Sequence, residues 1–484
     1  MRRMEDDPGL PIIFGPVSNG EYDPEPPDSV QLAAIAEANR GVDEGAARTG
    51  MSRRDFLKSS CAMAVALLAL DRTTAAALGV RQVHYPIPPE AAFDSEVADE
   101  LFRVGDFVLD LQGHLLEYDL DPSTRSGWFW GRQFPQANCR DEDDPRACFT
   151  MDHFLEEVFV RSDTTMVALS GLPILPEGSP LPPEVMEETR RVVTALSTDP
   201  RVVVNALALP QVGPLSSLLE EMERTASGYS IHGWKTFTHF PAGMAWRLDD
   251  ADPRLSLVGD VFLDAVERLG RPILTVHKGL AGGARSGSPQ DMGPAAVAHP
   301  GVSFVVYHSG YEVSIREGPY KLGTAHLGTN RLIRSLQDAR LERGRNVYAE
   351  LGSTWFHLMR RPREAAHLLG KLLNAVGEDN VLWGTDSIFY GSPQSQIDAF
   401  RAFEIPPEMQ EQYGYPALTP RIKAKILGYN AARLYGVDPV SVPLRYTPEE
   451  LREARRQHPV GFRAWGPTTK AEVAEFRAHH RGWP

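Results

Sequence analysis

Short apolar runs and amphipathic stretches alternate along the chain between residues 106 and 437. Runs of this length favour buried parallel strands, whereas apolar residues that recur every three to four positions favour helices. The predicted strands are 106–112, 164–170, 201–208, 231–237, 271–277, 302–308, 346–351 and 381–386. The predicted helices include 183–197, 214–226, 256–269, 327–341, 364–376 and 421–437. Eight βα units predict an α/β fold of the (β/α)8 TIM-barrel type, with a doubly wound open sheet as the alternative.

The pattern also divides the chain into segments. Residues 1–50 are acidic and rich in proline, and we expect them to be disordered. Residues 51–80 resemble an export signal, and residues 81–105 form a linker into the barrel at 106–437. Residues 438–484 show charged helical patterns and are expected to form a C-terminal helical tail.

A long stretch, 115–163, separates the first two predicted strands and carries Trp128 and Trp130. Loops of this length in a compact domain are usually lids or binding loops, so we expect it to cover the barrel mouth and contact substrate. The alternative is a surface insertion with its own small core. Cys139 and Cys148 in this stretch either form a disulfide or are two separate thiols.

The segment 52–58, SRRDFLK, resembles a twin-arginine export motif. The apolar run 61–70 follows it, and small residues near Ala75 to Ala77 offer cleavage points. No apolar run reaches the ~18 residues of a membrane span, so we expect no stable span after processing. These features predict export by the twin-arginine machinery to the periplasm or the extracellular space. The alternative is an arginine pair before a buried helix, and either Met1 or Met51 is the start.

Composition narrows the function further. The chain has 484 residues and a formal net charge of −14. Phosphate binding requires a basic surface, so nucleic acid is not an expected partner. No GxGxxG stands at a strand–helix junction, and a dinucleotide site is therefore not expected either.

Four predicted strands end in side chains that bind metals. They are found in DLQGH (110–114), LTVHKG (274–279), VVYHSG (305–310) and LWGTDS (382–387). The carboxyl ends of barrel strands meet at one mouth, so distant residues converge there. Imidazole and carboxylate are ligands of zinc and related ions. The candidate ligands and catalytic groups are Gln112, His114, His277, His308 and Asp386.

Each of these residues also has a structural interpretation. His114 could cap the first strand, His277 and His308 could be hydrogen-bonded core histidines, and Asp386 could be a turn residue. Gln112 is a neutral amide and a weaker ligand, which relatively favours ions that prefer oxygen, such as manganese.

The strand-end motifs and the closing ILGYNAARLYG resemble the amidohydrolase superfamily, specifically the amidohydrolase-related branch of hydrolases and aromatic-acid decarboxylases. The resemblance implies that His114 is the second histidine of an HxH motif. It implies that His277 and Asp386 are further ligands and that His308 activates or orients water. Gln112 stands where the first histidine belongs.

Two further residues are substrate-binding candidates. Lys235 lies where some branches of the superfamily carry a carbamylated lysine that bridges two metals; here we expect it to line the pocket or bind a substrate carboxylate. Glu350 ends the seventh predicted strand and either faces the mouth or is structural.

These observations lead to three functional hypotheses. The first is an exported hydrolase with one divalent ion, zinc or else manganese. Activated water attacks the amide, ester or lactone carbonyl of a small molecule, Asp386 accepts the proton and His308 stabilises the oxyanion. The second is a metal-dependent decarboxylase of an aromatic or enol carboxylic acid. The third is a secreted, non-catalytic binding protein on the same scaffold. A homodimer is compatible with each of them.

Overall fold

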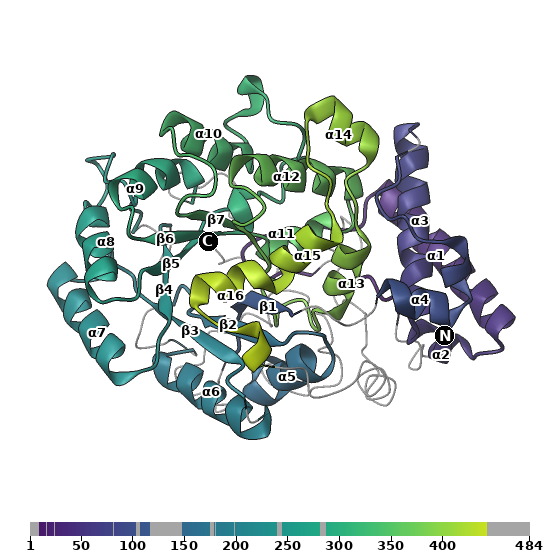
Figure 1. The fold of residues 1–484 in the computed structure, drawn as a ribbon, viewed down its shortest axis with the longest axis horizontal. Helices are drawn as coiled ribbons and strands as arrows, with labels where there is room; N and C mark the ends of the chain where they lie inside the picture. Colours follow the sequence, from purple (N-terminus) through teal and green to yellow (C-terminus); the bar gives the residue numbers. More distant parts are fainter. Residues whose placement is uncertain are drawn as a thin grey trace.

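Eight parallel strands form one sheet in the order β1 to β8, and helices surround it in the computed structural model (Figure 1). The structure describes residues 9–442 apart from 16, 24, 81, 103–106, 117–147, 175–178, 180, 198, 240–243 and 281–286. The strands are β1 (Leu109–Gly113), β2 (Met166–Ser170), β3 (Val202–Leu207), β4 (Gly233–Phe237), β5 (Ile273–His277), β6 (Ser303–Tyr307), β7 (Val347–Glu350) and β8 (Val381–Leu382). The predicted (β/α)8 barrel is therefore confirmed.

The sheet closes between its first and last strands. The backbone N–H of Leu111 donates to the carbonyl of Trp383 at 3.1 Å, and Gly113 pairs with Ser387 in a parallel bridge. Closure brings the ends of β1 and β8 side by side, so residues separated by most of the chain share one rim.

The alternation of side chains along each strand divides the core into two layers. Leu109, Leu111, Val305 and Tyr307 lie in an inner cluster, whereas Val306 and neighbours on other strands pack against the outer helices. Both faces of the sheet are buried, and this is why the strands read as continuous apolar runs in the sequence.

Helices lie around the outside of the barrel, between successive strands and, from α13 onward, after β8 (Figure 1). They are α5 (Met151–Leu155), α6 (Pro183–Ser197), α7 (Leu215–Gly228), α8 (Gly259–Arg268), α9 (Met292–Ala298), α10 (Asn330–Asp338), α11 (Gly352–Leu358), α12 (Pro362–Ala375), α13 (Gln394–Ala402), α14 (Pro407–Tyr413), α15 (Pro420–Ala424) and α16 (Asn430–Tyr435). A π-helical turn at Lys425–Tyr429 joins α15 to α16, so the helix predicted at 421–437 is present with an internal irregularity.

The prediction of disorder over residues 1–50 is wrong for residues 29–49, which form α1 (Ser29–Thr49). The Asp28 side chain caps the start of this helix, and Gly50 ends it in a left-handed conformation. The buried face repeats every four residues at Ala34, Ala38 and Val42. The prediction was wrong because it relied on the acidic, proline-rich composition of residues 1–50 and not on the helical spacing of these small apolar residues.

Helix α1 packs directly along α3 (Ser60–Leu78); α2 (Arg53–Leu57) contacts both helices at one end of the pair, and α4 (Ser95–Leu101) packs against α3 (Figure 1). In the part of the chain that the structure describes, α3 alone is long and apolar enough to cross a membrane. Of its most apolar window, 61% is buried within the fold, against α1 and also against α12 and α13. The predicted 81–105 linker contains α4.

Residues 9–23 precede these helices and run across the carboxyl ends of the barrel strands. Ile12, Ile13 and Phe14 are almost fully buried, and the backbone carbonyl of Ile13 accepts a hydrogen bond from Arg360 at 3.4 Å. A segment with no regular structure of its own is thus part of the core.

Two predicted regions are only partly described. Trp128, Trp130 and Cys139 in the 115–163 insertion lie outside the described residues, and so does the tail from 443 onward. Cys148 is disulfide-bonded, in agreement with the pairing that the sequence allows, and Phe149 packs against Phe389 with ring centroids 5.9 Å apart.

Candidate metal centre

The local backbone explains how each candidate side chain reaches the barrel mouth. Lys235, His277 and Glu350 lie on β4, β5 and β7, and all three are buried. His308 and Asp386 follow β6 and β8 with φ angles of 62° and 60°. Left-handed backbone is costly for residues with side chains, and it clusters at functional sites. The backbone of His308 and Asp386 therefore supports a functional role for these two residues.

Asp386 is the most densely hydrogen-bonded group at the mouth. It accepts hydrogen bonds from Gln112 Nε2 at 2.9 Å, Asn19 Nδ2 at 2.8 Å and Ser353 Oγ at 2.5 Å. His114 Nε2 lies 3.3 Å from its Oδ1. Burial alone would raise the pKa of Asp386, but the hydrogen bond from His114 and the other nearby donors hold it below its ordinary value. The carboxylate is therefore ionised.

The other half of the centre contains Glu21, His277 and His308. One ligand-capable atom from each lies within 4.8 Å of those of the others. Glu21 Oε2 faces His277 Nε2 at 2.7 Å, yet among the described residues neither atom has a hydrogen-bond partner. Burial lowers the pKa of His277 well below its ordinary value and that of His308 to about 3. Both rings are neutral, which is the form that binds metal ions.

Gln112 links the two halves of the centre. Its amide nitrogen donates to Asp386 and lies 3.3 Å from His308 Nε2, while its Oε1 has no hydrogen-bond partner among the described residues. Gly352 packs so closely here that a Cβ on it would lie 2.5 Å from Gln112 Oε1. The amide oxygen is therefore buried against Gly352 with no hydrogen-bond donor among the described residues.

The two predicted substrate-binding residues have different surroundings. Lys235 Nζ lies 3.6 Å from the centroid of the Tyr307 ring and has no hydrogen-bond partner among the described residues. Burial lowers its pKa to about 7, against the attraction of Glu21 and Glu350. Glu350 accepts from the backbone N–H groups of His308 at 3.1 Å and Gly352 at 2.6 Å. Glu350 thus holds the loops after β6 and β7.

Sequence reasoning missed three residues at this mouth: Asn19, Glu21 and Ser353. Asn19 and Glu21 lie in the 9–23 segment, far from any predicted strand end, and Ser353 lies in the first turn of α11. No periodicity or spacing marks these positions.

A divalent cation fits the donor set. Unpaired carboxylate, amide and imidazole atoms from Glu21, Gln112 and His277 are buried beside an ionised Asp386, and buried polar atoms are normally hydrogen-bonded. Such unsatisfied groups facing one another are expected where an ion is bound.

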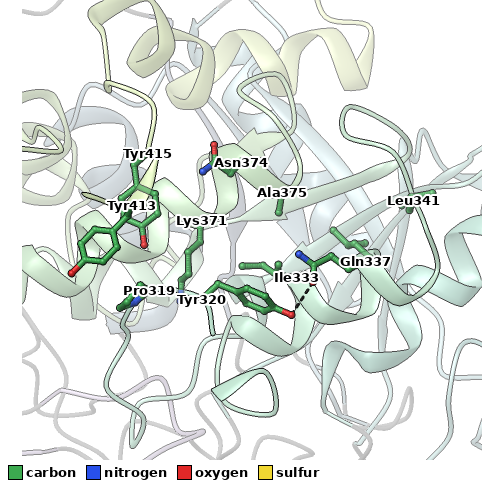
Figure 2. A pocket seen from close by; sticks show the side chains of 11 residues that line it. Pro319, Tyr320, Ile333, Gln337, Leu341, Lys371, Asn374, Ala375, Tyr413 and Tyr415 are labelled. Carbon is green, nitrogen blue, oxygen red and sulfur yellow. Dashed lines mark hydrogen bonds between the residues drawn. The ribbon is translucent and has the colours of Figure 1, made fainter. Parts of the chain in front are cut away.

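A separate pocket of about 430 Å³ lies outside the barrel, between α10, α12 and α14 (Figure 2). Tyr320 donates to Gln337 across it at 2.8 Å. Lys371 in its wall is already paired with Glu317 at 2.5 Å, so its charge is neutralised. None of the side chains that line this pocket is a candidate metal ligand, so we do not assign the reaction to it.

The sequence profile of the amidohydrolase family matches residues 179–437. A search of curated proteins returns no match.

Solved structures with similar folds have low sequence identity. A probable 2-pyrone-4,6-dicarboxylic acid hydrolase from Acinetobacter baumannii is 14% identical with a TM-score of 0.41, covering 68% of this chain and 99% of that one. A 2,6-dihydroxybenzoate decarboxylase from Rhizobium is 16% identical with a TM-score of 0.39, covering 69% and 99%. A dihydroxybenzoic acid decarboxylase from Polaromonas, with bound manganese, is 14% identical with a TM-score of 0.39, covering 69% and 97%. Identities of this size do not define a shared reaction.

Proposed function

Because the chain belongs to the amidohydrolase family, we propose that it is a metal-dependent enzyme that hydrolyses an amide, ester or lactone bond of a small molecule. The observation that carries this proposal is the convergence of four side chains at the barrel mouth. His114 Nε2 lies 3.3 Å from Asp386 Oδ1, and the rings of His277 and His308 lie with their centroids 4.7 Å apart. His114, His277 and Asp386 would hold the ion. A divalent cation held by these residues would supply Lewis acidity, which polarises a carbonyl oxygen and lowers the pKa of a bound water to about 7.

The side chains around the ion supply the other steps. Asp386 is ionised and accepts the proton that leaves the attacking water. His308 has a ring nitrogen, Nδ1, without a hydrogen-bond partner among the described residues, and in the Nδ1–H tautomer it donates to the developing oxyanion. Lys235 lies deeper in the barrel and binds an anionic part of the substrate when it is protonated.

One observation favours a decarboxylase as the second candidate. Asp386 is hydrogen-bonded to Gln112, Asn19 and Ser353 at once, which stabilises its ionised form and weakens it as a base. Decarboxylation needs no attack by water, and Lys235 offers a cation for the carboxylate that is lost.

The test replaces Asp386 with Asn and measures turnover on a panel of esters, lactones, amides and hydroxylated aromatic acids. We expect a loss of about 1,000-fold or more in kcat, since both a ligand and a proton acceptor are removed. Asp338→Asn is the matched control, because Asp338 is exposed on α10 and, among the described residues, forms an ion pair only with Arg334. Full activity of Asp386→Asn on a substrate that the wild type turns over would refute the mechanism.

The nature of the product separates the candidates. Release of an acid with an alcohol, an amine or an opened ring identifies hydrolysis, and release of carbon dioxide identifies decarboxylation. A protein that binds a divalent ion and small molecules but turns none of them over would be a binding protein instead. Zinc and manganese are compared by adding each ion to metal-free protein.

We also propose export by the twin-arginine route, on the basis of SRRDFLK at 52–58 and the apolar helix that follows. In the folded chain Arg53 is bonded to Asp43 at 2.5 Å and to Asn39, so the motif must be recognised before α2 packs on α1. Cell fractionation of the wild type and of the double variant Arg53→Lys, Arg54→Lys tests this. Equal distribution of the two proteins would refute export.

A further inference from the structure

The N-terminal segment 9–23 supplies side chains to a centre that otherwise belongs to the barrel. Ser18, Asn19 and Gly20 are buried, and the segment lies more than 200 residues before His277 and Asp386 in the sequence. It is not part of any βα unit, so barrel formation alone does not require it there.

A compact turn holds these side chains in place. Asn19 Oδ1 accepts from the Glu21 N–H at 3.0 Å, while Asn19 Nδ2 donates to Glu21 Oε1 at 3.1 Å and to Asp386 Oδ2 at 2.8 Å. Tyr22 donates its hydroxyl to the Val17 carbonyl at 3.0 Å and lies 3.1 Å from the Tyr390 hydroxyl. Asn19 therefore fixes Glu21 and Asp386 relative to each other.

This arrangement leaves one oxygen of Glu21 free. Oε1 is occupied by Asn19, and Oε2 faces His277 Nε2 at 2.7 Å without a hydrogen-bond partner among the described residues. A carboxylate buried next to a second carboxylate, Asp386, and neutral imidazoles is costly unless a cation lies between them. Lys235 is the nearby cation, but its Nζ makes no hydrogen bond to either carboxylate in this part of the structure.

We propose that Glu21 is a ligand of the divalent ion and fills the place that Gln112 leaves without an imidazole. This inference rests on the proposed metal-dependent function and extends it. The charged carboxylate restores the affinity that a neutral amide lacks. The 9–23 segment is then a permanent part of the active site, held on the barrel by its hydrogen bonds with Asp386, Tyr390 and Arg360.

The assignment of Glu21 as a ligand has a consequence for proteolytic processing. Cleavage near Ala75 to Ala77, or a start at Met51, would remove Glu21 and Asn19 from the chain. The proposal therefore predicts that the active form of the protein retains Glu21.

The experiment compares metal binding by the full-length wild type with that of Glu21→Gln, Glu25→Gln and His277→Ala. Purified proteins are stripped, reloaded with zinc or cobalt(II), and titrated against a chromogenic chelator. Glu25 is the matched control, because it lies four residues after Glu21 and pairs on the surface with Arg361 at 3.1 Å. Thermal melting of the stripped proteins shows that each variant folds.

We expect Glu21→Gln to weaken zinc binding by about 100-fold or more, because loss of an outer-shell partner alone costs about 10- to 100-fold. The visible spectrum of its cobalt form should change, and Glu25→Gln should match the wild type in both measurements. Mass spectrometry of the active protein should find Glu21 still attached.

Other outcomes would overturn the inference. If His277→Ala loses the ion while Glu21→Gln keeps wild-type affinity and spectrum, the metal centre stands and the role of Glu21 falls. If the wild type binds no ion, the proposed function itself falls. Higher turnover by Glu21→Gln, or by protein cleaved after α3, would show that the segment is an inhibitory plug instead.

Discussion

The two carboxyl groups Asp386 and Glu350 at the candidate metal centre differ in their hydrogen-bond partners and in their pKa values. Asp386 is surrounded by donors, whereas Glu350 takes its hydrogen bonds from backbone N–H groups of His308 and Gly352. Burial raises the pKa of Glu350 well above its ordinary value, and its position in the barrel interior makes it a support for His308. Two carboxyl groups on neighbouring strands thus have different roles because their partners differ.

The Gly384→Ala variant tests the supporting role of Glu350. A Cβ at position 384 would collide with Glu350 Oε1, so the carboxyl must move and release the N–H groups of His308 and Gly352. We expect a loss of about 1–3 kcal/mol in stability from overpacking and a large loss of activity. Urea denaturation and kinetics measure the two effects; Gly323→Ala, at an exposed position with open space and no positive φ, is the matched control. An active, wild-type-stable Gly384→Ala would contradict this role.

At the residue scale, the sequence predicted which metal-capable side chains lie at the barrel mouth when they are at or just after the ends of apolar strands. His114, His277, His308 and Asp386 are found because the carboxyl ends of parallel strands converge. Glu21 and Asn19 could not be found this way, since their position depends on a long-range packing contact and not on a local pattern.

Close packing of small residues joins α1 to the rest of the N-terminal unit. A Cβ on Gly41 would lie 2.7 Å from Val65 Cγ1 of α3, and one on Gly45 would lie 2.7 Å from Phe56 Cε2 of α2 and 2.9 Å from the Ala92 carbonyl. Because α1 begins only a few residues after the 9–23 segment, we expect the packing of α1 to help position that segment.

The Gly45→Leu variant should separate α1 from α2. We expect a loss of about 1–3 kcal/mol in stability from the added volume, together with weaker metal binding because Glu21 becomes less well positioned. Ala47→Leu places the same side chain on the exposed face of α1 and should change neither property. Calorimetry and the chelator titration provide the measurements. Unchanged metal affinity in a destabilised Gly45→Leu protein would show that the segment is held by its barrel contacts alone.

At the element scale, periodicity located the strands and outer helices but not every boundary. The strand predicted at 381–386 stops at Leu382, because the N–H of Trp383 donates to Ile426 in place of a strand partner and the chain then turns to bring Asp386 inward. Helix α3 was predicted as a removable signal, yet the same apolar residues pack on α1, α12 and α13. Composition alone does not distinguish these two uses of an apolar helix.

In the whole molecule, a bound ion would stabilise the fold. The proposed ligands lie on β5, just after β1 and β8, and in the 9–23 segment, so a cation held by them would cross-link the two ends of the barrel and the N-terminal segment. Binding to the folded state alone adds stability by mass action.

Removal of the metal with a chelator should therefore lower the melting temperature. At a free ion concentration about 100 times Kd the ion contributes about 2.7 kcal/mol, and this contribution is lost on chelation. Scanning calorimetry with and without chelator measures the effect, and His277→Ala should show no difference between the two conditions. A wild-type melting temperature that is indifferent to chelator would contradict a structural contribution from the ion.

The position of the 9–23 segment has a consequence for biosynthesis. The ribosome produces these residues before the barrel strands, but their binding site is complete only when β8 and Asp386 have emerged, more than 360 residues later. A segment that is made before the barrel therefore docks only after the barrel is complete.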